Sequence, residues 1–240
     1  MKLTDVSRAL RRLRWKKRCS AVIVAAGTAS RMQGIDKIME PLGGIPVILR
    51  TVQAFQNCQE IQKIVIVTRE ALILPISELC RDCDKVQAVV AGGASRQESV
   101  ERGLAALKGQ AELVAIQDGA RPLVTPALIA RVVFAAQRYG AAIPAIPVKD
   151  TIKIAKNTLV TATPDRKKLQ AVQTPQVFDY DLLRGALAQA KKDHAVVTDD
   201  ASAVERLGMA VKIVEGAEEN IKITTPLDLE IAQRYLEEQL

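Results

Sequence analysis

Short apolar runs alternate along this chain with longer segments of helical spacing, and this alternation constrains the fold more than any other feature. The strand-like runs, rich in β-branched residues, are 20–26, 61–68, 85–93, 112–120 and 141–148. Helix-like segments follow the first four of them, at 45–58, 71–83, 95–109 and 125–140. This rhythm is typical of a mostly parallel sheet with helices on both faces. We therefore predict an α/β fold, a Rossmann-like doubly wound, mostly parallel sheet.

Two of the predicted helices carry end signals in the sequence. Ser95 stands three residues before Glu98, which is the spacing of a capping box and predicts a helix start. Thr125, followed by a proline, and Gly140 predict the two ends of the next helix. The prolines within 141–148 cannot donate to a strand ladder, so we expect this strand near an edge of the sheet.

The rhythm breaks over 149–172. Alternating runs on either side of Lys156 and Asn157 predict two strands joined by a turn, a β-arm that leaves the main sheet. The α/β pattern then resumes, with helix-like segments at 179–192, 198–208 and 225–240 and a strand-like one at 210–216. We expect one domain over 19–240 that includes this arm, with no second domain after it.

A net charge of +7 can indicate nucleic-acid binding, but here the position of the charge in the chain argues against it. Residues 1–18 hold eight lysines and arginines against one aspartate, and the rest of the chain holds equal numbers of basic and acidic side chains. The charge thus belongs to a basic N-terminal extension. We interpret it as a solvated segment, or as a translation start assigned too far upstream, so nucleic acid is not an expected partner. A nucleic-acid or membrane-surface arm, or an amphipathic transit peptide, is the alternative.

The apolar runs and the cysteines bear on the compartment. No run reaches the roughly 18 apolar residues of a membrane span, so no membrane partner is expected. Cys80 and Cys83 form half of a zinc-type pair, but Cys58 stands alone and His194 is the only histidine. We interpret the cysteines as reduced thiols, which favours a cytoplasmic protein, and keep a zinc site or redox pair as the alternative.

Three loops rich in small residues follow predicted strands directly: "AAGTASRM" (25–32), "AGGASR" (91–96) and "QDGARP" (117–122). Because the carboxyl ends of parallel strands lie on one rim, where ligands bind, we expect these loops to meet. The cations expected at this rim are Arg31, Lys37, Arg96, Arg121 and Lys222. With the backbone N–H groups of the loops and a few acidic groups, they fit a substrate with several phosphates and a bound Mg²⁺.

The first loop matches neither of the common nucleotide-binding motifs. After Gly27, Ala29 and Met32 take the second and third glycine positions of the dinucleotide pattern, and no Gly-Lys-Ser/Thr of a P-loop follows. The end of the second strand lacks a clear acidic residue to bind a ribose. A dinucleotide-dependent dehydrogenase is therefore only an alternative. A Ser-His-Asp triad cannot be built, because His194 falls at a predicted helix end.

With these residues assembled, the chain resembles the 2-C-methyl-D-erythritol 4-phosphate cytidylyltransferases, a family of the non-mevalonate pathway to isoprenoids. The resemblance runs from about Ser20 to the C-terminus and leaves 1–18 outside. Its ordered motifs are "AAGTASRM", "GGASRQESV", "DGARP", "PVKDTIK", "QTPQVF", "TDDASAVE" and "ENIKITTPLDL". It implies a nucleotidyltransferase-type fold, a homodimer, and transfer of CMP from CTP to methylerythritol phosphate with Mg²⁺ or another divalent cation.

The resemblance also implies roles for individual residues. Arg31 and Lys37 would stabilise the transition state as the catalytic pair. The nucleotide would be held by Ala25, Ala26, Gly27, Gly92, Gly93, Arg96, Ser99, Asp118 and Gly119. The acceptor would face Asp118, Arg121, Thr151, Arg166, Thr174, Thr198 and Lys222. Asp118 would lie near the metal ion, and Arg166, on the exchanged arm of a homodimer, would act in the partner's site.

Several of these positions have a simpler interpretation, and some depart from the family. Thr151 and Thr174 suit strands by β-propensity alone, and Asp118 suits the start of a loop. Ala29 replaces a family glycine, which puts the tightness of the triphosphate loop in question. Asp36 sets a negative charge beside the catalytic lysine.

The substrates also leave alternatives open. The acceptor could be ribitol 5-phosphate, the substrate of a sister family of cytidylyltransferases, and the nucleotide could be UTP or ATP. The small Ala120 favours methylerythritol phosphate, because the sister family tends to carry a bulkier residue there.

Overall fold

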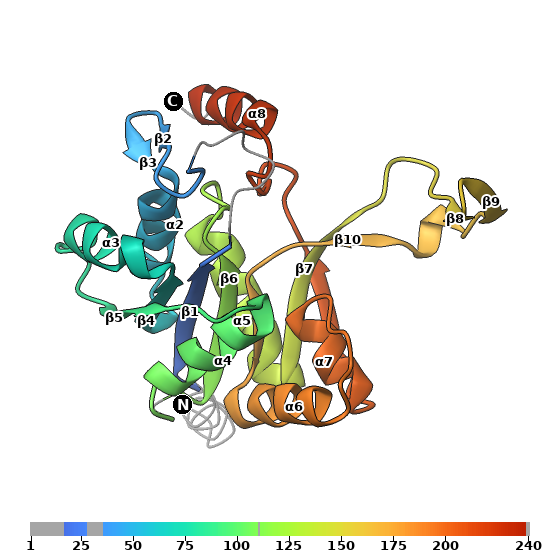
Figure 1. Cartoon of the computed structure of the whole chain (residues 1–240), viewed down its shortest axis with the longest axis horizontal. Helices are drawn as coiled ribbons and strands as arrows, with labels where there is room; N and C mark the ends of the chain where they lie inside the picture. The colour runs from blue at the N-terminus through green and yellow to red at the C-terminus, as the bar shows by residue number, and fades with distance from the viewer. Residues whose placement is uncertain (1–16, 28–35, 110, 239–240) are drawn as a thin grey trace, which may run out of the picture.

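The computed structural model of this chain describes residues 17–27, 36–109 and 111–238. Its centre is an eight-stranded sheet with the path β10–β7–β11–β6–β1–β4–β5, in which β12 also pairs with β7 (Figure 1). The strands are β1 (Cys19–Ala25), β4 (Ile61–Thr68), β5 (Val86–Ala91), β6 (Leu113–Asp118), β7 (Ala141–Pro147), β10 (Gln170–Val172), β11 (Gln176–Asp179) and β12 (Lys212–Glu215). All neighbouring pairs are parallel except those made by β10 and β11.

Strand β1 lies inside the parallel part of the sheet and explains why these segments form strands. It pairs with β4 on one side and with β6 on the other, so that Val22 is opposite both Val65 and Ile116. Almost every residue of β1 is buried, and a strand covered on both faces is apolar without alternation. The chain therefore first reaches the rim of the sheet just after Ala25.

Helices cover both faces of the sheet and form one apolar cluster on each. The first face carries α2 (Val47–Gln56), α3 (Ile73–Leu79), α5 (Pro126–Tyr139) and α8 (Pro226–Glu237). The second face carries α4 (Arg96–Ala106), α6 (Tyr180–Lys192) and α7 (Asp200–Arg206) (Figure 1). The predicted α/β, doubly wound, mostly parallel architecture is confirmed.

The predicted helix ends are confirmed in their local geometry. The Ser95 hydroxyl accepts a hydrogen bond from the Glu98 N–H, and the Thr125 hydroxyl accepts one from the Leu128 N–H. Gly140 ends α5 in the left-handed conformation, at φ +81°. Glu98 does not complete the predicted capping box with Ser95, because its carboxylate accepts a hydrogen bond from the Ala94 N–H.

Strand β7 lies near an edge of the sheet, as predicted, but it is not the edge strand itself. It is paired on both sides, with β11 and β10 on one and β12 on the other, so β12 forms the edge. Proline lacks an N–H but keeps its carbonyl, and the Pro144 oxygen accepts from the Gln173 N–H at 2.8 Å. Pro147, the second proline, is the last residue of the strand. Neither proline therefore interrupts the pairing.

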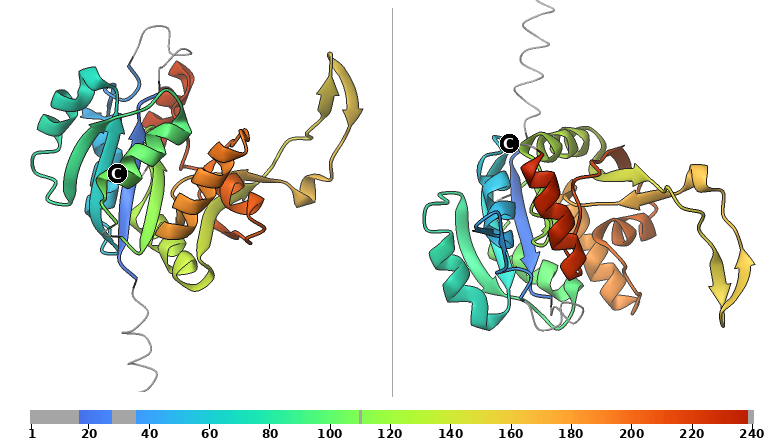
Figure 2. Two further views of the ribbon diagram at one scale, coloured as in Figure 1. Left: turned by 60° about the horizontal axis from the view of Figure 1, so that its bottom comes forward. Right: turned by 90° about the horizontal axis from the view of Figure 1, so that it is seen from above.

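The β-arm is shorter than predicted. Its hairpin consists of β8 (Ile154–Lys156) and β9 (Leu159–Ala162), followed by the short helix η2 (Arg166–Lys168). The arm projects away from the sheet in both views of Figure 2. The predicted range ran to residue 172, but residues 170–172 are β10 and pair with β7 in the main sheet.

Two further small features, a hairpin and a short helix, complete the fold. The sequence did not predict the hairpin β2 (Pro41–Leu42) and β3 (Ile45–Pro46), nor the helix η1 (Glu70–Leu72). Gly43 lies in the turn of the hairpin, and its N–H donates a hydrogen bond to Oε1 of Gln233 in α8 at 2.9 Å. Among the described residues, no helix has the length and apolar character to cross a membrane.

Candidate active site

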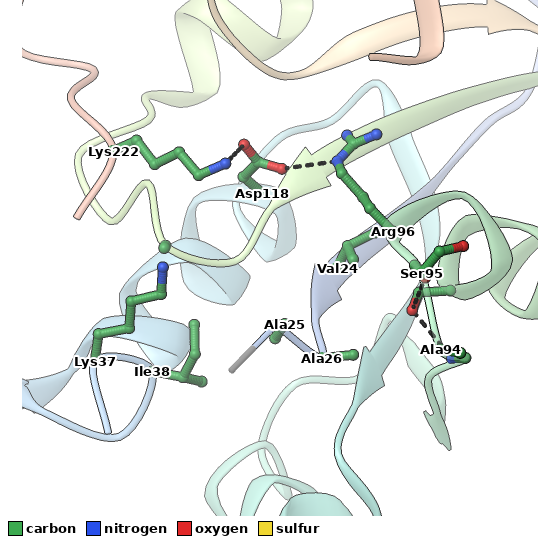
Figure 3. Close-up of a pocket in the computed structure, with 14 residues that line it drawn as sticks. Val24, Ala25, Ala26, Lys37, Ile38, Ala94, Ser95, Arg96, Asp118 and Lys222 are labelled. Atoms are coloured by element: carbon green, nitrogen blue, oxygen red, sulfur yellow. Dashed lines mark hydrogen bonds and ion pairs between the residues drawn. The ribbon is translucent and has the colours of Figure 1, made fainter. Parts of the chain in front are cut away.

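A cavity of about 330 Å³ opens at the carboxyl ends of β1, β5 and β6 (Figure 3). The predicted site residues that line it are Ala25, Ala26, Gly27, Lys37, Gly93, Arg96, Ser99, Asp118 and Lys222. These residues come from five separate parts of the chain. The prediction that the small-residue loops meet on one rim is thereby confirmed for their described parts.

Two predicted glycines lie behind the cavity wall, where they allow close packing. A Cβ atom on Gly92 would lie 2.3 Å from the Cβ of Ala26 and 2.9 Å from the Oγ of Ser99. A Cβ on Gly119 would lie 3.0 Å from the Cβ of Ala25. Glycine at both positions lets the loops after β5 and β6 approach the loop after β1.

The second loop is held by side chains of the helix that it starts. Ser99 Oγ accepts from the Gly93 N–H at 3.1 Å and donates to the Ser95 carbonyl at 2.9 Å. Arg102 donates to the Gly92 carbonyl at 2.8 Å. The loop is therefore fixed before any ligand binds.

Asp118 ends β6 between two cations. Its Oδ2 lies 2.7 Å from Lys222 Nζ, and its Oδ1 lies 3.5 Å from Arg96 Nε (Figure 3). Its N–H donates to the Thr174 hydroxyl at 3.1 Å. Burial alone would raise the pKa of Asp118, but the charges of Lys222 and Arg96 lower it below the ordinary value. The carboxylate is thus ionised and fixed on both sides.

Arg96 joins this carboxylate to a second one. Its Nη2 donates to Oδ2 of Asp200 at 2.7 Å. Burial alone would lower the pKa of Arg96, but Asp200 and Asp118 raise it. Burial raises the pKa of Asp200, although the neighbouring guanidinium opposes this shift. A row of alternating charges therefore runs from Asp200 through Arg96 and Asp118 to Lys222.

A second cavity, of about 520 Å³, shares Arg96, Asp118 and Lys222 with the first. The predicted acceptor residues that line it are Arg121, Thr174, Thr198 and Lys222, together with Asp118. Its remaining lining is polar, with Gln173, Gln176, Asp199, Ser202 and Glu205 beside the apolar Val172. Two substrates placed in the two cavities would meet at the shared residues.

A buried amide network holds the second cavity in shape. Asn220 Nδ2 donates to the Thr174 carbonyl at 3.0 Å and to Gln173 Oε1 at 3.2 Å. The Arg121 guanidinium donates to the Asn220 carbonyl at 2.6 Å. These bonds tie the segment before Lys222 to Gln173 and Thr174, and Thr174 in turn contacts Asp118.

Lys37 points toward the Asp118 side of the first cavity in Figure 3. Its neighbour Asp36 forms an ion pair with Arg69. The negative charge that departs from the family pattern is therefore balanced by a cation of this chain. Arg31 and Ala29, the other predicted residues of this loop, lie outside the described residues.

Thr151 and Arg166 are not brought to either cavity of their own chain. Both are exposed on the arm, and Arg166 Nη1 donates to the Lys149 carbonyl at 2.5 Å. Their predicted roles remain predictions.

The acidic groups of the site fit a Mg²⁺ ion that arrives with phosphates. Among the described residues, no three His, Cys, Asp or Glu side chains are grouped so that they could hold a metal ion. Mg²⁺ usually keeps several waters and binds through one or two carboxylates plus substrate phosphates. Asp118 can supply such a carboxylate, whereas the described residues offer no site that would hold the ion through protein groups alone.

Three residues of this site had no predicted role. Asp200 belongs to the motif "TDDASAVE", and Gln173 and Gln176 belong to "QTPQVF". Gln176 donates to Asp199 at 2.8 Å and accepts from the Ala201 N–H at 3.0 Å, so it orients the start of α7. The sequence held no clear signal for this role, because Gln176 is the first residue of the four-residue strand β11.

A doubly wound sheet whose rim joins a glycine-lined, cationic cavity to a polar one defines a nucleotidyltransferase of Rossmann-like fold. The profile of the 2-C-methyl-D-erythritol 4-phosphate cytidylyltransferase family matches residues 19–238. The chain belongs to this family, and the dehydrogenase alternative is set aside.

Individual relatives agree with this assignment. The chain is 46% identical over 225 residues to the 2-C-methyl-D-erythritol 4-phosphate cytidylyltransferase of Syntrophotalea carbinolica, covering 90% of this chain and 95% of that protein. It is 46% identical over 226 residues to the protein of that name from Desulforamulus reducens, covering 90% and 94%. The crystal structure of 4-diphosphocytidyl-2C-methyl-D-erythritol synthase from Anaerococcus prevotii superposes with a TM-score of 0.83 at 33% identity, covering 92% and 97% of the two chains.

Proposed function

We propose that this chain transfers the CMP group of CTP to 2-C-methyl-D-erythritol 4-phosphate, giving 4-diphosphocytidyl-2-C-methyl-D-erythritol and pyrophosphate. The observation that carries this proposal is the wall of Arg96, Asp118 and Lys222 that the two cavities share. One cavity has the glycine loops and cations that suit a triphosphate, and the other has the hydroxyl and guanidinium groups that suit a phosphorylated polyol. Family membership supports this choice of substrates and a place in the non-mevalonate pathway to isoprenoid precursors.

The reaction exchanges one phosphorus–oxygen bond for another. A phosphate oxygen of methylerythritol phosphate attacks the α-phosphorus of CTP, the bond to the oxygen that bridges to the β-phosphate breaks, and its electron pair leaves with pyrophosphate. Because no covalent bond to the protein is needed, positioning and charge stabilisation carry the rate. Lys37 and Arg31 offset the negative charge that grows on the phosphate oxygens in the transition state.

The residues around the two cavities divide the binding between them. The nucleotide lies against the loops of Gly27 and Gly93, where the absence of side chains lets its phosphates approach the backbone. The acceptor phosphate lies against Arg121 and Lys222, with the hydroxyls of Thr174 and Thr198 beside the polyol. Asp118, at the boundary, accepts hydrogen bonds from substrate hydroxyls.

We also propose that Mg²⁺, or another divalent cation, enters with the triphosphate. The bound ion would offset charge on the phosphate oxygens. Asp118 is the side chain we assign to it, through one carboxylate oxygen or a bridging water. Arg96 and Lys222 hold that carboxylate in place.

A homodimer, with Arg166 acting in the partner's site, is part of this proposal. The arm exposes Ile154, Leu159 and Val160, whose exposed fractions are 54%, 72% and 60%. Apolar side chains gathered on a projecting arm are typical of an interaction surface. The position of Arg166 outside both cavities of its own chain suits a residue that serves another copy.

The compartment is also a proposal. All four cysteines are free and buried, which supports the prediction of a reducing, cytoplasmic environment. Burial raises the pKa of Cys80 to about 12 and also raises that of Cys83, so neither thiol has the character of a reactive redox group. Residues 1–16 of the basic extension lie outside the described residues, and Lys17, within the extension, pairs with Asp179 at 2.8 Å.

The test is a panel of pyrophosphate-release assays with Mg²⁺. CTP, UTP and ATP are each paired with methylerythritol phosphate and with ribitol 5-phosphate. We expect turnover with CTP and methylerythritol phosphate, and at least about 100-fold lower kcat/KM for every other pair, as expected when buried polar groups of a site lose their partners. A preference for ribitol 5-phosphate would keep the mechanism and replace the acceptor.

A further inference from the structure

We infer that Asp200 is a positioning residue for the transfer reaction, which acts by holding Arg96 at the wall between the two cavities. The inference rests on the proposed function of that wall. Asp200 itself lines neither cavity, so it acts through another residue and not by contact with substrate.

The geometry places Arg96 between two carboxylates that come from different elements. Arg96 is the first residue of α4, Asp200 is the first residue of α7, and Asp118 ends β6. The short contact of Arg96 is the one to Asp200, at 2.7 Å from Nη2, whereas its Nε lies 3.5 Å from Asp118. Asp200 therefore determines where the guanidinium lies, and the guanidinium in turn faces one oxygen of Asp118.

The burial of Asp200 indicates that this contact is its main task. Its side chain is 1% exposed. Within the described part of the chain, its Oδ1 has no hydrogen-bond partner, so Oδ2 and Arg96 make the only polar contact of the carboxylate there. A buried carboxylate with a single charged partner contributes little to stability compared with an apolar residue of similar size. Its place beside the site points to function.

The charge row explains what the loss of Asp200 would do. Among the described residues, Asp118 is the one other carboxylate that forms an ion pair with Arg96, and a guanidinium prefers to bind a carboxylate through two parallel hydrogen bonds. Arg96 would then turn toward Asp118 and compete with Lys222 for it. The carboxylate would lose the fixed orientation from which it can accept hydrogen bonds from substrate.

The kinetic test is a double-mutant cycle of Asp200→Asn and Arg96→Lys. We expect Asp200→Asn to lower kcat/KM for methylerythritol phosphate by roughly 10- to 100-fold, because small misplacements of positioning groups have effects of this size. If Asp200 acts through Arg96, the double variant should be no slower than Arg96→Lys alone, within about threefold. Asp193→Asn is the control, since this carboxylate is exposed and pairs with Arg206 away from both cavities.

The spectroscopic test reads the guanidinium directly. In the full-length protein, the side-chain ¹⁵N signals of Arg96 should show hindered rotation and slow proton exchange, which Asp200→Asn should abolish and Asp193→Asn should leave unchanged. Asp200→Glu keeps the charge and should retain the signature and more activity than Asp200→Asn. It also serves as the informative variant if Asp200→Asn fails to fold, as judged by circular dichroism.

The outcomes separate this inference from the proposed function. Multiplicative losses in the double variant, or Arg96 signals that do not respond to Asp200→Asn, would overturn the positioning role. An inactive wild-type protein would instead overturn the proposed function, and the Arg96 signals would still decide whether Asp200 holds the guanidinium.

Discussion

Asp118 is the residue on which the two cavities depend. It is held by Lys222 through one oxygen and by Arg96 near the other, while Thr174 accepts from its backbone. A carboxylate with a partner on each side keeps its orientation without substrate, and such preorganisation is worth most in a site from which water is excluded. The same contacts make its ionisation a measurable part of stability.

The first prediction concerns Asp118→Asn and pH. Since the folded-state pKa of Asp118 lies below its ordinary value, its contribution to stability is present above the unfolded pKa of about 3.9 and is lost as the pH falls through the lower folded value. We expect the free energy of unfolding of the variant to be roughly 1–3 kcal/mol lower than that of the wild type at pH 7. This difference should shrink below about pH 4.

Urea unfolding of wild type and variant between pH 7 and pH 3 measures this difference. Asp181→Asn is the matched control, because that side chain is 80% exposed and should show little deficit. A deficit for Asp118→Asn that stays constant across the pH range would contradict the assignment to its ion pairs.

At the scale of elements, α4 carries the site on a tight contact with the sheet. Arg96 and Ser99 are in its first turn, and further along Gly103 faces strands β1 and β4. A Cβ on Gly103 would lie 2.3 Å from Val22 Cγ1 and 2.9 Å from Val67 Cγ2. Both valines are fully buried, so the helix would have to move off the sheet to make room.

The second prediction compares two helical glycines. Gly103→Ala should lower the free energy of unfolding by roughly 1–3 kcal/mol through overpacking, and it should also raise the KM for CTP because α4 moves. Gly185→Ala in α6 is its matched control, since a Cβ there meets nothing within 4 Å. The free energy of unfolding of that variant should rise by about 0.5–1 kcal/mol. If denaturant unfolding shows that both substitutions change the free energy of unfolding in the same direction, overpacking at Gly103 is contradicted.

The elements also decide how far the sequence predicts the site. The loops after Ala25, Ala91 and Asp118 were predictable as neighbours, because parallel strands end on one rim. β11 was not predicted, because its four residues are too short for a clear pattern and a polar Gln176 opens them. The partnership of Arg96 with Asp200 could not be read either, since the two residues are 104 positions apart and no local pattern links them.

At the scale of the whole molecule, we propose that two copies of the chain act together. Lys37 lines the first cavity, whereas Arg166 lines neither cavity. Arg166 belongs to the arm, and the β8–β9 hairpin of this arm projects away from the sheet (Figure 1). Closed twofold symmetry would let each arm reach the other's site. In the homodimer that we propose, a complete site would draw residues from two chains.

The third prediction is a complementation experiment. Lys37→Gln and Arg166→Gln should each be nearly inactive as purified proteins. In a heterodimer of the two, one site has both native residues and the other has neither. Random exchange of subunits should thus restore about one quarter of the wild-type activity per chain. Each variant mixed with itself is the control, and no recovery despite subunit exchange, followed by mass spectrometry, would contradict the action of Arg166 across a dimer.

In the proposed reaction, CMP and no other part of the nucleotide is transferred across the wall between the two cavities. The most direct measurement uses CTP labelled with ³²P at the α- or the γ-phosphate, with methylerythritol phosphate and Mg²⁺. We expect the α-label to appear in the product of methylerythritol phosphate and the γ-label to appear only in pyrophosphate. A γ-label in the acceptor product, or a fully unlabelled acceptor with folded wild-type protein, would contradict it.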